Sequence, residues 1–589
     1  MSWIGRSLRG ATAGFTVLFA CALVARLSSL GPWTLGVLSE RLSGAVIAGA
    51  VATLFGVMAW RRHGGLLGSA AVLVATYGFD ADVTRRRSAL FALLCLGIPW
   101  ALHAALDRGR ERAFPWILCA IAAVAGLGTV VAADRLPYRT ELPTISAAAP
   151  PPGAPHIVLI TMDTTRYDAV IGSEAAPALA RFVETALSFP QTVAEASHTH
   201  PSMASLVTSR MPLEHDSIAT SPVINPVLPT LAAHLRRSGY RTAGFLENPW
   251  LGPDFGLADG YEYLHRKAQR TRIDAWLDQH KDSPAFLHVH LFEPHGPYEL
   301  RTNYLPPGPL APWRDSANKL GQVISAEFIR AGEEPGAHGL NPTDFEWLQR
   351  IYLTEVGAMD SWIRDFIEHT ERTLGTNTIF VITADHGEEF GDHGGLHHGH
   401  TLHAELVHVP LLIRIPGVAP GTHSISAGLV DVAPTILDAA GLTPLPNAAG
   451  RSLLAKELTA LPRVSTRFFK DGEHLFSIQS GEWKLVLRTD AGIDLHGQPI
   501  DFVREARSSS LQLYRWADDP GEQRNVVDEH PNVVERLQSE LGQWHAKILA
   551  RKSRDPQLGR AGSSAKQPSR STYESLRGLG YSGVVPGSK

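Results

Sequence analysis

Cysteine is scarce in this chain, with 3 among 589 residues, which excludes a disulfide-stapled scaffold and a cysteine-based zinc cluster. All three (Cys21, Cys95 and Cys119) lie in apolar runs near the N-terminus. The long remainder has none, which suits an oxidising compartment where a free thiol is a liability. An excess of either charge is also lacking, because 54 Lys and Arg face 58 Asp and Glu. The resulting net charge of −4 argues against a nucleic-acid partner.

Lysine is missing from the first 133 residues, which carry 12 Arg, 5 acidic residues and five uncharged apolar runs. The runs cover residues 10–25, 42–60, 63–79, 88–106 and 113–133. A helix needs about 20 apolar residues to span a bilayer, so residues 1–133 are predicted to form four or five transmembrane helices in contact with membrane lipid. A single run would fit a signal peptide or a buried helix, but the repetition favours membrane spans.

The number of spans decides on which side of the membrane the rest of the chain lies. Five spans with a cytoplasmic N-terminus would place it outside the cytoplasm, and four would reverse the side. We expect an integral membrane protein whose large C-terminal part is periplasmic or extracellular, with the arginine distribution in weak support.

Beyond residue 133 the amino-acid composition changes. Residues 134–155 are rich in proline and predict an extended linker. The following part is large enough for one α/β core over residues 156–460, a C-terminal subdomain over residues 461–550 and a tail over residues 551–589.

Continuous apolar runs predict strands buried on both faces of a sheet. They cover residues 156–163, 285–292, 378–383 and 410–415. Helical patterns cover residues 228–238, 347–373 and 431–440, and this alternation implies a mostly parallel sheet flanked by helices. Nearer the C-terminus, hairpin strands are predicted over residues 468–489, a further strand over 511–515 and a last helix over 532–549.

Two predicted strands end in residues that suit a divalent cation. Asp163 closes the first strand, and Asp385 and His386 follow the strand that ends at Thr383. Carboxylates and a neutral imidazole are normal ligands of such a cation, and sites in open parallel sheets form at the carboxyl ends of strands. Each residue alone would fit a cap or turn, but the two strand ends together favour a metal site.

A predicted helix start lies between these ligands in the sequence. Pro201 suits a first helical turn and places Thr199 and His200 at the N-terminal mouth. Free N–H groups there would attract an anionic ester, and a metal-bound hydroxyl could act as a nucleophile. Taken by itself, this segment favours a plain capping role for Thr199.

Histidine is concentrated between residues 386 and 408, where seven occur: His386, His393, His397, His398, His400, His403 and His408. A solvated loop does not need so much imidazole. Some should be structural, and two or three are candidates for metal ligand, proton donor or charge stabiliser. Residues 290–295 (HLFEPH), at the end of their strand, add His290 and His295 as candidates.

These pieces, in this order, resemble the sulfatase family of the alkaline phosphatase superfamily. The matching segments are residues 158–168 (VLITMDTTRYD), 199–210 (THPSMASLVTSR), 292–298 (FEPHGPY), 384–393 (ADHGEEFGDH) with 399–402 and 409–412, and 513–522 with Asn525. The resemblance covers about residues 155–550. It implies an alkaline-phosphatase-like α/β sandwich with a small C-terminal antiparallel sheet.

The resemblance also implies roles. Asp163, Thr199, Asp385 and His386 would hold one divalent metal ion. Thr199 would be the catalytic nucleophile, with His295 and His400 contacting the ester or its leaving group. His398 and His290 are the further candidate substrate contacts, and His398 is an alternative to His400.

Two departures from the family pattern bear on the chemistry. Thr199 stands where sulfatases have a Cys or Ser that becomes formylglycine, and Met203 stands where they have Arg. Thr cannot become formylglycine, and a sulfated Thr lacks the second hydroxyl that expels sulfate. Phosphoryl transfer is therefore favoured. Thr164 replaces a second Asp ligand, which favours Mn²⁺ or Zn²⁺, with Ca²⁺ or Mg²⁺ as alternatives.

The expected function is a membrane-anchored, metal-dependent hydrolase of sulfate or phosphate esters, with a small-molecule, lipid or glycan substrate. The alternative is a transferase of the phosphoethanolamine or phosphoglycerol type that modifies a cell-envelope lipid or glycan. A degenerate, non-enzymatic scaffold is disfavoured because the acid, hydroxyl and Asp-His set is complete.

Overall fold

The computed structural model describes residues 148–217, 223–304, 340–469, 472–489, 493–505 and 510–555. The chain divides into the units Met1–Tyr138 and Arg139–Lys589, and every described residue belongs to the second. The apolar runs of residues 1–133, the start of the linker and most of the tail lie outside the described residues. Within the described ranges, no helix has the length and apolar character needed to cross a bilayer. The membrane spans stay a prediction.

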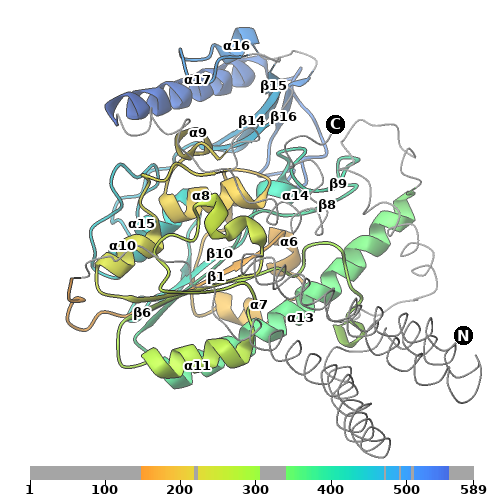
Figure 1. Cartoon of the computed structure of the whole chain (residues 1–589). Helices are drawn as coiled ribbons and strands as arrows, with labels where there is room; N and C mark the ends of the chain where they lie inside the picture. Colours follow the sequence, from red (N-terminus) through yellow and green to blue (C-terminus); the bar gives the residue numbers. More distant parts are fainter. Residues whose placement is uncertain are drawn as a thin grey trace, which may run out of the picture. The chain divides into compact units, whose positions relative to one another are not determined.

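A mostly parallel sheet forms the centre of the described unit, as the sequence predicts (Figure 1). Its strand order is β11-β2-β10-β7-β1-β6-β4-β5. Five neighbouring strands run parallel: β7 (Thr378–Ala384), β1 (His156–Met162), β6 (Ala285–Leu291), β4 (Arg241–Leu246) and the edge strand β5 (Tyr263–His265). β10 (Leu411–Arg414) runs antiparallel to both β7 and β2 (Leu187–Ser188), and β11 (Gly421–Thr422) closes the edge.

Helices cover both faces of this sheet (Figure 1). On one face lie α8 (Thr199–Thr208), α10 (Leu231–Arg237) and α15 (Val432–Ala439). On the other lie α7 (Pro177–Val183), α11 (Arg270–His280) and α13 (Pro342–Leu374). α13 begins earlier than predicted, because Asn341 and Asp344 form a capping box around Pro342.

Shorter elements connect these layers. They are α6 (Tyr167–Val170), α9 (Pro212–His215), α14 (Ala404–Val407), α16 (Phe502–Glu505), the 3₁₀ turns η1 (Pro249–Leu251), η2 (Pro253–Phe255), η3 (Thr302–Tyr304) and η4 (Leu429–Asp431), and two small strand pairs, β3 (Gln191–Val193) with β12 (Ser426–Gly428) and β8 (Glu389–Phe390) with β9 (Leu396–His397).

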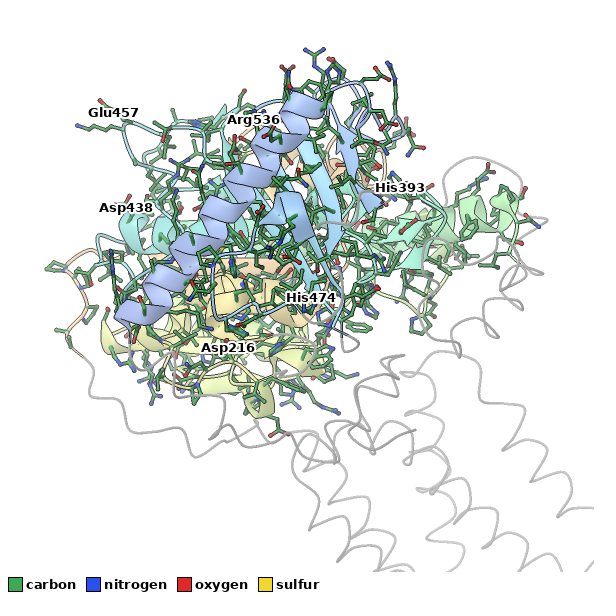
Figure 2. All side chains as sticks on the ribbon, turned by 90° about the horizontal axis from the view of Figure 1, so that it is seen from above. Asp216, His393, Asp438, Glu457, His474 and Arg536 are labelled. Atoms are coloured by element: carbon green, nitrogen blue, oxygen red, sulfur yellow. The ribbon has the colours of Figure 1, made fainter. Side chains whose placement is uncertain are left out.

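A second, antiparallel sheet contains β13 (Arg463–Phe468), β14 (His474–Ser480), β15 (Trp483–Thr489) and β16 (Gln512–Tyr514), in that order. Helix α17 (Pro531–Arg554) lies across its strands (Figure 2) and buries Leu537 and Leu541 against Phe476 and Leu485. The small C-terminal sheet of the expected fold is therefore present. The domain boundaries at residues 460 and 550 stay predictions.

Candidate active site

The predicted metal ligands meet at the carboxyl ends of the central strands. Asp163 follows β1, Asp385 and His386 follow β7, and Thr199 is the first residue of α8. All four side chains are buried. One ligand atom each of Asp163, Asp385 and His386 lies within 4.8 Å of the others. The Thr199 hydroxyl lies 3.2 Å from Nε2 of His386. Residues more than two hundred positions apart in the sequence thus form one compact cluster.

The donor set of this cluster fits a divalent cation. Nδ1 of His386 donates to the carbonyl oxygen of Gly387 at 2.9 Å, so Nε2 carries the lone pair. Nε2 of His386 lies 3.8 Å from Oδ1 of Asp163 and 3.5 Å from Oδ2 of Asp385. Oδ1 of Asp163 is buried, and among the described residues no donor makes a hydrogen bond to it. Acceptors that face one another in a buried site require a cation or a proton between them.

The pKa shifts of the two carboxyl groups also favour a bound cation. Burial disfavours charge on Asp163, but His295, His290 and His386 outweigh it and hold its pKa below the usual range. Burial and the neighbouring charge of Asp163 raise the pKa of Asp385 well above its usual range. The raised pKa favours protonation of Asp385 by the protein groups alone, and a bound cation would compete with that proton.

Asn248 is a site residue that the sequence did not reveal. It follows β4, and its Nδ2 donates to Oδ2 of Asp163 at 2.7 Å and reaches the Thr199 hydroxyl at 3.4 Å. Its Oδ1 accepts from the backbone N–H of Trp250 at 3.0 Å, which fixes the amide orientation. Recognition of β4 as a strand would have drawn attention to the residues at its carboxyl end.

Thr164, where many sulfatases have a second Asp, contributes through its backbone. Its φ of 47° lies in the left-handed region, a strained conformation for a β-branched residue. In this conformation its N–H donates to Oδ1 of Asp385 at 3.1 Å, and its carbonyl accepts from the hydroxyl of Tyr352 at 3.0 Å. The strain at Thr164 therefore serves to orient Asp385.

His295 and His398 face the cluster. The His398 ring lies 4.5 Å from the His386 ring and 5.0 Å from the His295 ring, measured between centroids. Nδ1 of His398 donates to Oε1 of Glu388 at 2.8 Å, and Nδ1 of His295 donates to the carbonyl oxygen of Gly296 at 2.6 Å. These two bonds fix the orientation of both imidazole rings. Burial lowers the pKa of His398 well below its usual range, so this ring is neutral.

The other predicted histidines have different surroundings. His400 Nε2 bonds to Oε2 of Glu389 at 2.7 Å, which makes His398 the better placed of the two alternatives. His290 is fully buried behind Asp163, with Nε2 3.2 Å from Oδ2 of that residue, so we assign it to support of the carboxylate rather than to substrate contact. His200, at the predicted helix mouth, packs against Trp250 and bonds to Ser217.

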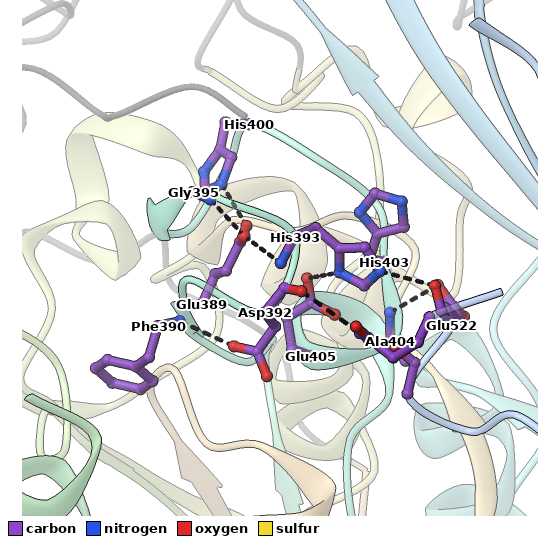
Figure 3. A network of polar contacts seen from close by, with 12 residues as sticks. Glu389, Phe390, Asp392, His393, Gly395, His400, His403, Ala404, Glu405 and Glu522 are labelled. Carbon is purple, nitrogen blue, oxygen red and sulfur yellow. Dashed lines mark hydrogen bonds and ion pairs between the residues drawn. The ribbon is translucent and has the colours of Figure 1, made fainter. Parts of the chain in front are cut away.

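A second group with ligand-type atoms, His393, His403 and Glu405, forms a polar network in which His393 pairs with Glu405 and stacks on His403 (Figure 3). His393 Nδ1 lies 2.8 Å from Oε1 of Glu405, and its Nε2 donates to the carbonyl oxygen of Glu522 at 2.9 Å. Both ring nitrogens face acceptors, so His393 carries two protons. Burial opposes this charge, but the bond to Glu405 outweighs it and raises the pKa of His393 to about 9. The network joins the histidine-rich loop to the C-terminal subdomain.

Comparison with known proteins identifies the class to which this fold and site belong. The sequence model described as Sulfatase matches residues 155–442. Choline-sulfatase of Rhizobium meliloti (strain 1021) is 22% identical over 435 residues, which cover 60% of this chain and 83% of that protein. Arylsulfatase K of Mus musculus is 28% identical over 237 residues, which cover 38% of this chain and 40% of that protein. The chain thus matches less than half the length of the arylsulfatase.

Solved structures share the fold. A protein in complex with its substrate D-glucosamine-2-N,6-O-disulfate gives a TM-score of 0.52 at 18% identity, covering 69% of this chain and 99% of that one. The phosphonate monoester hydrolase of Agrobacterium radiobacter gives a TM-score of 0.51 at 19% identity, covering 68% and 96%. Residues 155–442 therefore form a domain of the sulfatase family, within the alkaline phosphatase superfamily. The expected family and enzyme class, an ester hydrolase of the sulfatase type, are confirmed.

Proposed function

We propose that this chain is a metal-dependent hydrolase of sulfate or phosphate esters in which Thr199 is the nucleophile. The observation that carries the proposal is the position of the Thr199 hydroxyl, 3.2 Å from Nε2 of His386 at the start of α8. The N–H groups of the first turn and the helix dipole favour the binding of an anionic ester there. Nδ2 of Asn248 adds a further donor at 3.4 Å from the hydroxyl.

The metal would be held by Asp163, Asp385 and His386, with the Thr199 hydroxyl as a further ligand. A divalent cation at this position lowers the pKa of a bound hydroxyl and neutralises charge on the group being transferred. The carboxylate and imidazole set favours Mn²⁺ or Zn²⁺.

The proposed reaction has two steps. In the first, Oγ of Thr199, whose proton would go to solvent once the cation lowers the pKa of the hydroxyl, forms a bond to phosphorus or sulfur; the bond to the leaving oxygen breaks, and Nε2–H of His295 donates a proton to that oxygen. In the second, water attacks the transferred group, its proton passes to Nε2 of His398, and the bond to Thr199 breaks, which releases Oγ as the alkoxide; proton exchange with solvent returns both imidazoles to their starting states. Glu388, bonded to Nδ1 of His398 at 2.8 Å, would stabilise the imidazolium that forms.

The nucleophile favours phosphate over sulfate. A hydrated formylglycine expels sulfate through its second hydroxyl, and Thr199 offers no such group. A phosphorylated threonine can be resolved by attack of water at phosphorus. Relatives named choline-sulfatase and arylsulfatase K support a sulfate ester as the other candidate, and the first of these names supports a small-molecule carrier.

We also propose that residues 1–133 anchor the domain in a membrane, with the catalytic domain periplasmic or extracellular. The five apolar runs support this proposal. A reporter fused after Lys589 tests the side: an alkaline phosphatase fusion should be active and a fluorescent protein fusion dark. The opposite pattern would favour four spans.

The reaction class is tested with the full-length protein and the p-nitrophenyl esters of sulfate, phosphate and phenylphosphonate, with and without Mn²⁺ or Zn²⁺. Thr199→Ala should reduce kcat by about 10³-fold or more, while Thr199→Ser retains turnover. Thr208→Ala, at the buried far end of the same helix, is the matched control. Full activity in Thr199→Ala would overturn the proposal, and turnover that requires an added alcohol acceptor would favour the transferase.

A further inference from the structure

A chain of buried hydrogen bonds extends from Asp163 into the sheet, away from the nucleophile. Nε2 of His290 lies 3.2 Å from Oδ2 of Asp163, and Nδ1 of the same ring lies 2.8 Å from the hydroxyl of Thr161. The Thr161 hydroxyl also lies 2.9 Å from Nε2 of His288. Nδ1 of His288 lies 2.6 Å from the hydroxyl of Tyr261. Four hydrogen bonds therefore join Tyr261 to the predicted metal ligand.

Strand alternation explains how the sequence builds this chain. Successive side chains of a strand point to opposite faces, so Thr161 and Asp163 of the β1 segment share a face, as do His288 and His290 of β6. β1 and β6 are parallel neighbours, and Thr161 is the register partner of His290. None of the five side chains is more than 1% exposed, so water does not compete for these bonds.

The donors and acceptors of the hydrogen-bond chain can be assigned so that every bond donates toward Asp163. Asp163, as a carboxylate, only accepts, so His290 donates from Nε2 and accepts at Nδ1. The Thr161 hydroxyl then donates to His290 and accepts from Nε2–H of His288. Nδ1 of His288 is left as the acceptor for the Tyr261 hydroxyl. In this arrangement each imidazole uses one nitrogen as a donor and the other as an acceptor.

We propose that Tyr261, His288, Thr161 and His290 are positioning residues of the metal site, which orient Asp163 so that Oδ1 is presented to the cation. The bonds from His290 and Asn248 both fall on Oδ2, and Oδ1 is the oxygen that faces His386. The inference rests on the metal site of the proposed function. Outer hydrogen bonds of this kind typically change metal affinity by about 10- to 100-fold.

The test is the affinity of the full-length protein for Mn²⁺, measured by calorimetry. Thr161→Val keeps the shape of the side chain and removes the central hydroxyl, and we expect about 10- to 100-fold weaker binding. Thr161→Ser should restore it. Thr192→Val is the matched control, because among the described residues the buried Thr192 hydroxyl bonds to a local backbone carbonyl, that of Phe189. With saturating Mn²⁺, Thr161→Val should regain most of the kcat of the unmodified protein.

Tyr261, at the far end of the hydrogen-bond chain, gives a second pair of variants. Tyr261→Phe should weaken Mn²⁺ binding by about fivefold, the effect of one lost hydrogen bond. Tyr240→Phe is its control: that side chain is equally buried, and among the described residues its hydroxyl has no hydrogen-bond partner. In the metal-free protein, histidine-selective ¹⁵N NMR should show Nε2–H tautomers at His288 and His290, and Tyr261→Phe should alter the His288 signal.

The outcomes separate the two proposals. Equal Mn²⁺ affinities in Thr161→Val and Thr192→Val, with an active and metal-binding unmodified protein, would overturn the positioning role and leave the proposed function standing. Failure of the unmodified protein to bind Mn²⁺ or Zn²⁺ would overturn both. Nδ1–H tautomers at His288 and His290 would contradict the direction of the chain.

Discussion

Replacement of His393 by glutamine should remove a pH-dependent contribution to stability. The His393–Glu405 pair joins the turn between β8 and β9 to α14, and Nε2 of His393 extends the link to Glu522 (Figure 3). The pKa of His393 rises from 6.5 to about 9 in the folded protein, because Glu405 outweighs the opposing effect of burial. The folded state therefore holds a proton that the unfolded chain releases above pH 6.5.

The pKa difference between the folded and unfolded states sets the direction and the magnitude of the change in stability with pH. The stabilisation is fully present below pH 6.5 and is lost as the pH rises through about 9. At about 1.4 kcal/mol per pH unit, the whole effect is about 3 kcal/mol of unfolding free energy. The side chain of His393 is 12% exposed and that of Glu405 is 3% exposed, so solvent screening reduces this figure only modestly.

Urea unfolding of the unmodified protein and of His393→Gln, followed across this pH range, measures the effect. The two proteins should differ most at the acidic end and converge above about pH 9. His423→Gln, which replaces an exposed histidine, should track the unmodified protein throughout. A difference between the unmodified protein and His393→Gln that does not change with pH would refute the ion-pair interpretation.

Three further predictions follow from buried groups. Burial and the charge of Asp431 raise the pKa of Glu195 to about 8, so Glu195→Gln should stabilise the protein increasingly from pH 4.5 to about 8, as urea midpoints would show; a constant difference would contradict this. Asp163→Asn should weaken Mn²⁺ binding by about 100-fold or more in calorimetry, and unchanged binding would remove this residue from the ligand set. His398→Asn should slow breakdown of the covalent intermediate more than its formation, giving a burst of product in stopped-flow assays; a burst-free, uniformly slow reaction would exclude the role of His398 as a base.

Much of the fold could be predicted because its central strands are continuous apolar runs. β1, β6 and β7 are buried along almost their whole length, and each was expected within a residue or two of its observed bounds. β4 was not expected, because Gly244 and a short polar start weaken its pattern. The antiparallel direction of β10 depends on its neighbours in space, which the local sequence does not specify.

The candidate site was predictable where chemistry coincided with a strand end, as at Asp163 and Asp385. Site residues that are brought in only by tertiary packing could not be predicted from the sequence. Asn248 follows β4, which the sequence pattern does not predict, and His288 lies inside a predicted strand where its sequence neighbours do not mark it as part of a site. The histidines of the histidine-rich loop have different surroundings, which their spacing in the sequence does not reveal. His386 and His398 lie at the proposed metal site, and His400 bonds to Glu389. His393 and His403 stack on each other beside the C-terminal sheet, and His408 stacks on Tyr167.

Transfer of the phosphoryl group to Thr199 is the step on which the proposed mechanism depends. Its most direct test is acid quenching of the Mn²⁺-loaded protein during turnover of p-nitrophenyl phosphate, followed by peptide mass spectrometry. We expect a phosphorylated peptide whose modification maps to Thr199, and whose amount rises in His398→Asn. An unmodified Thr199 in both proteins during active turnover, or a modification that maps to another residue, would contradict it.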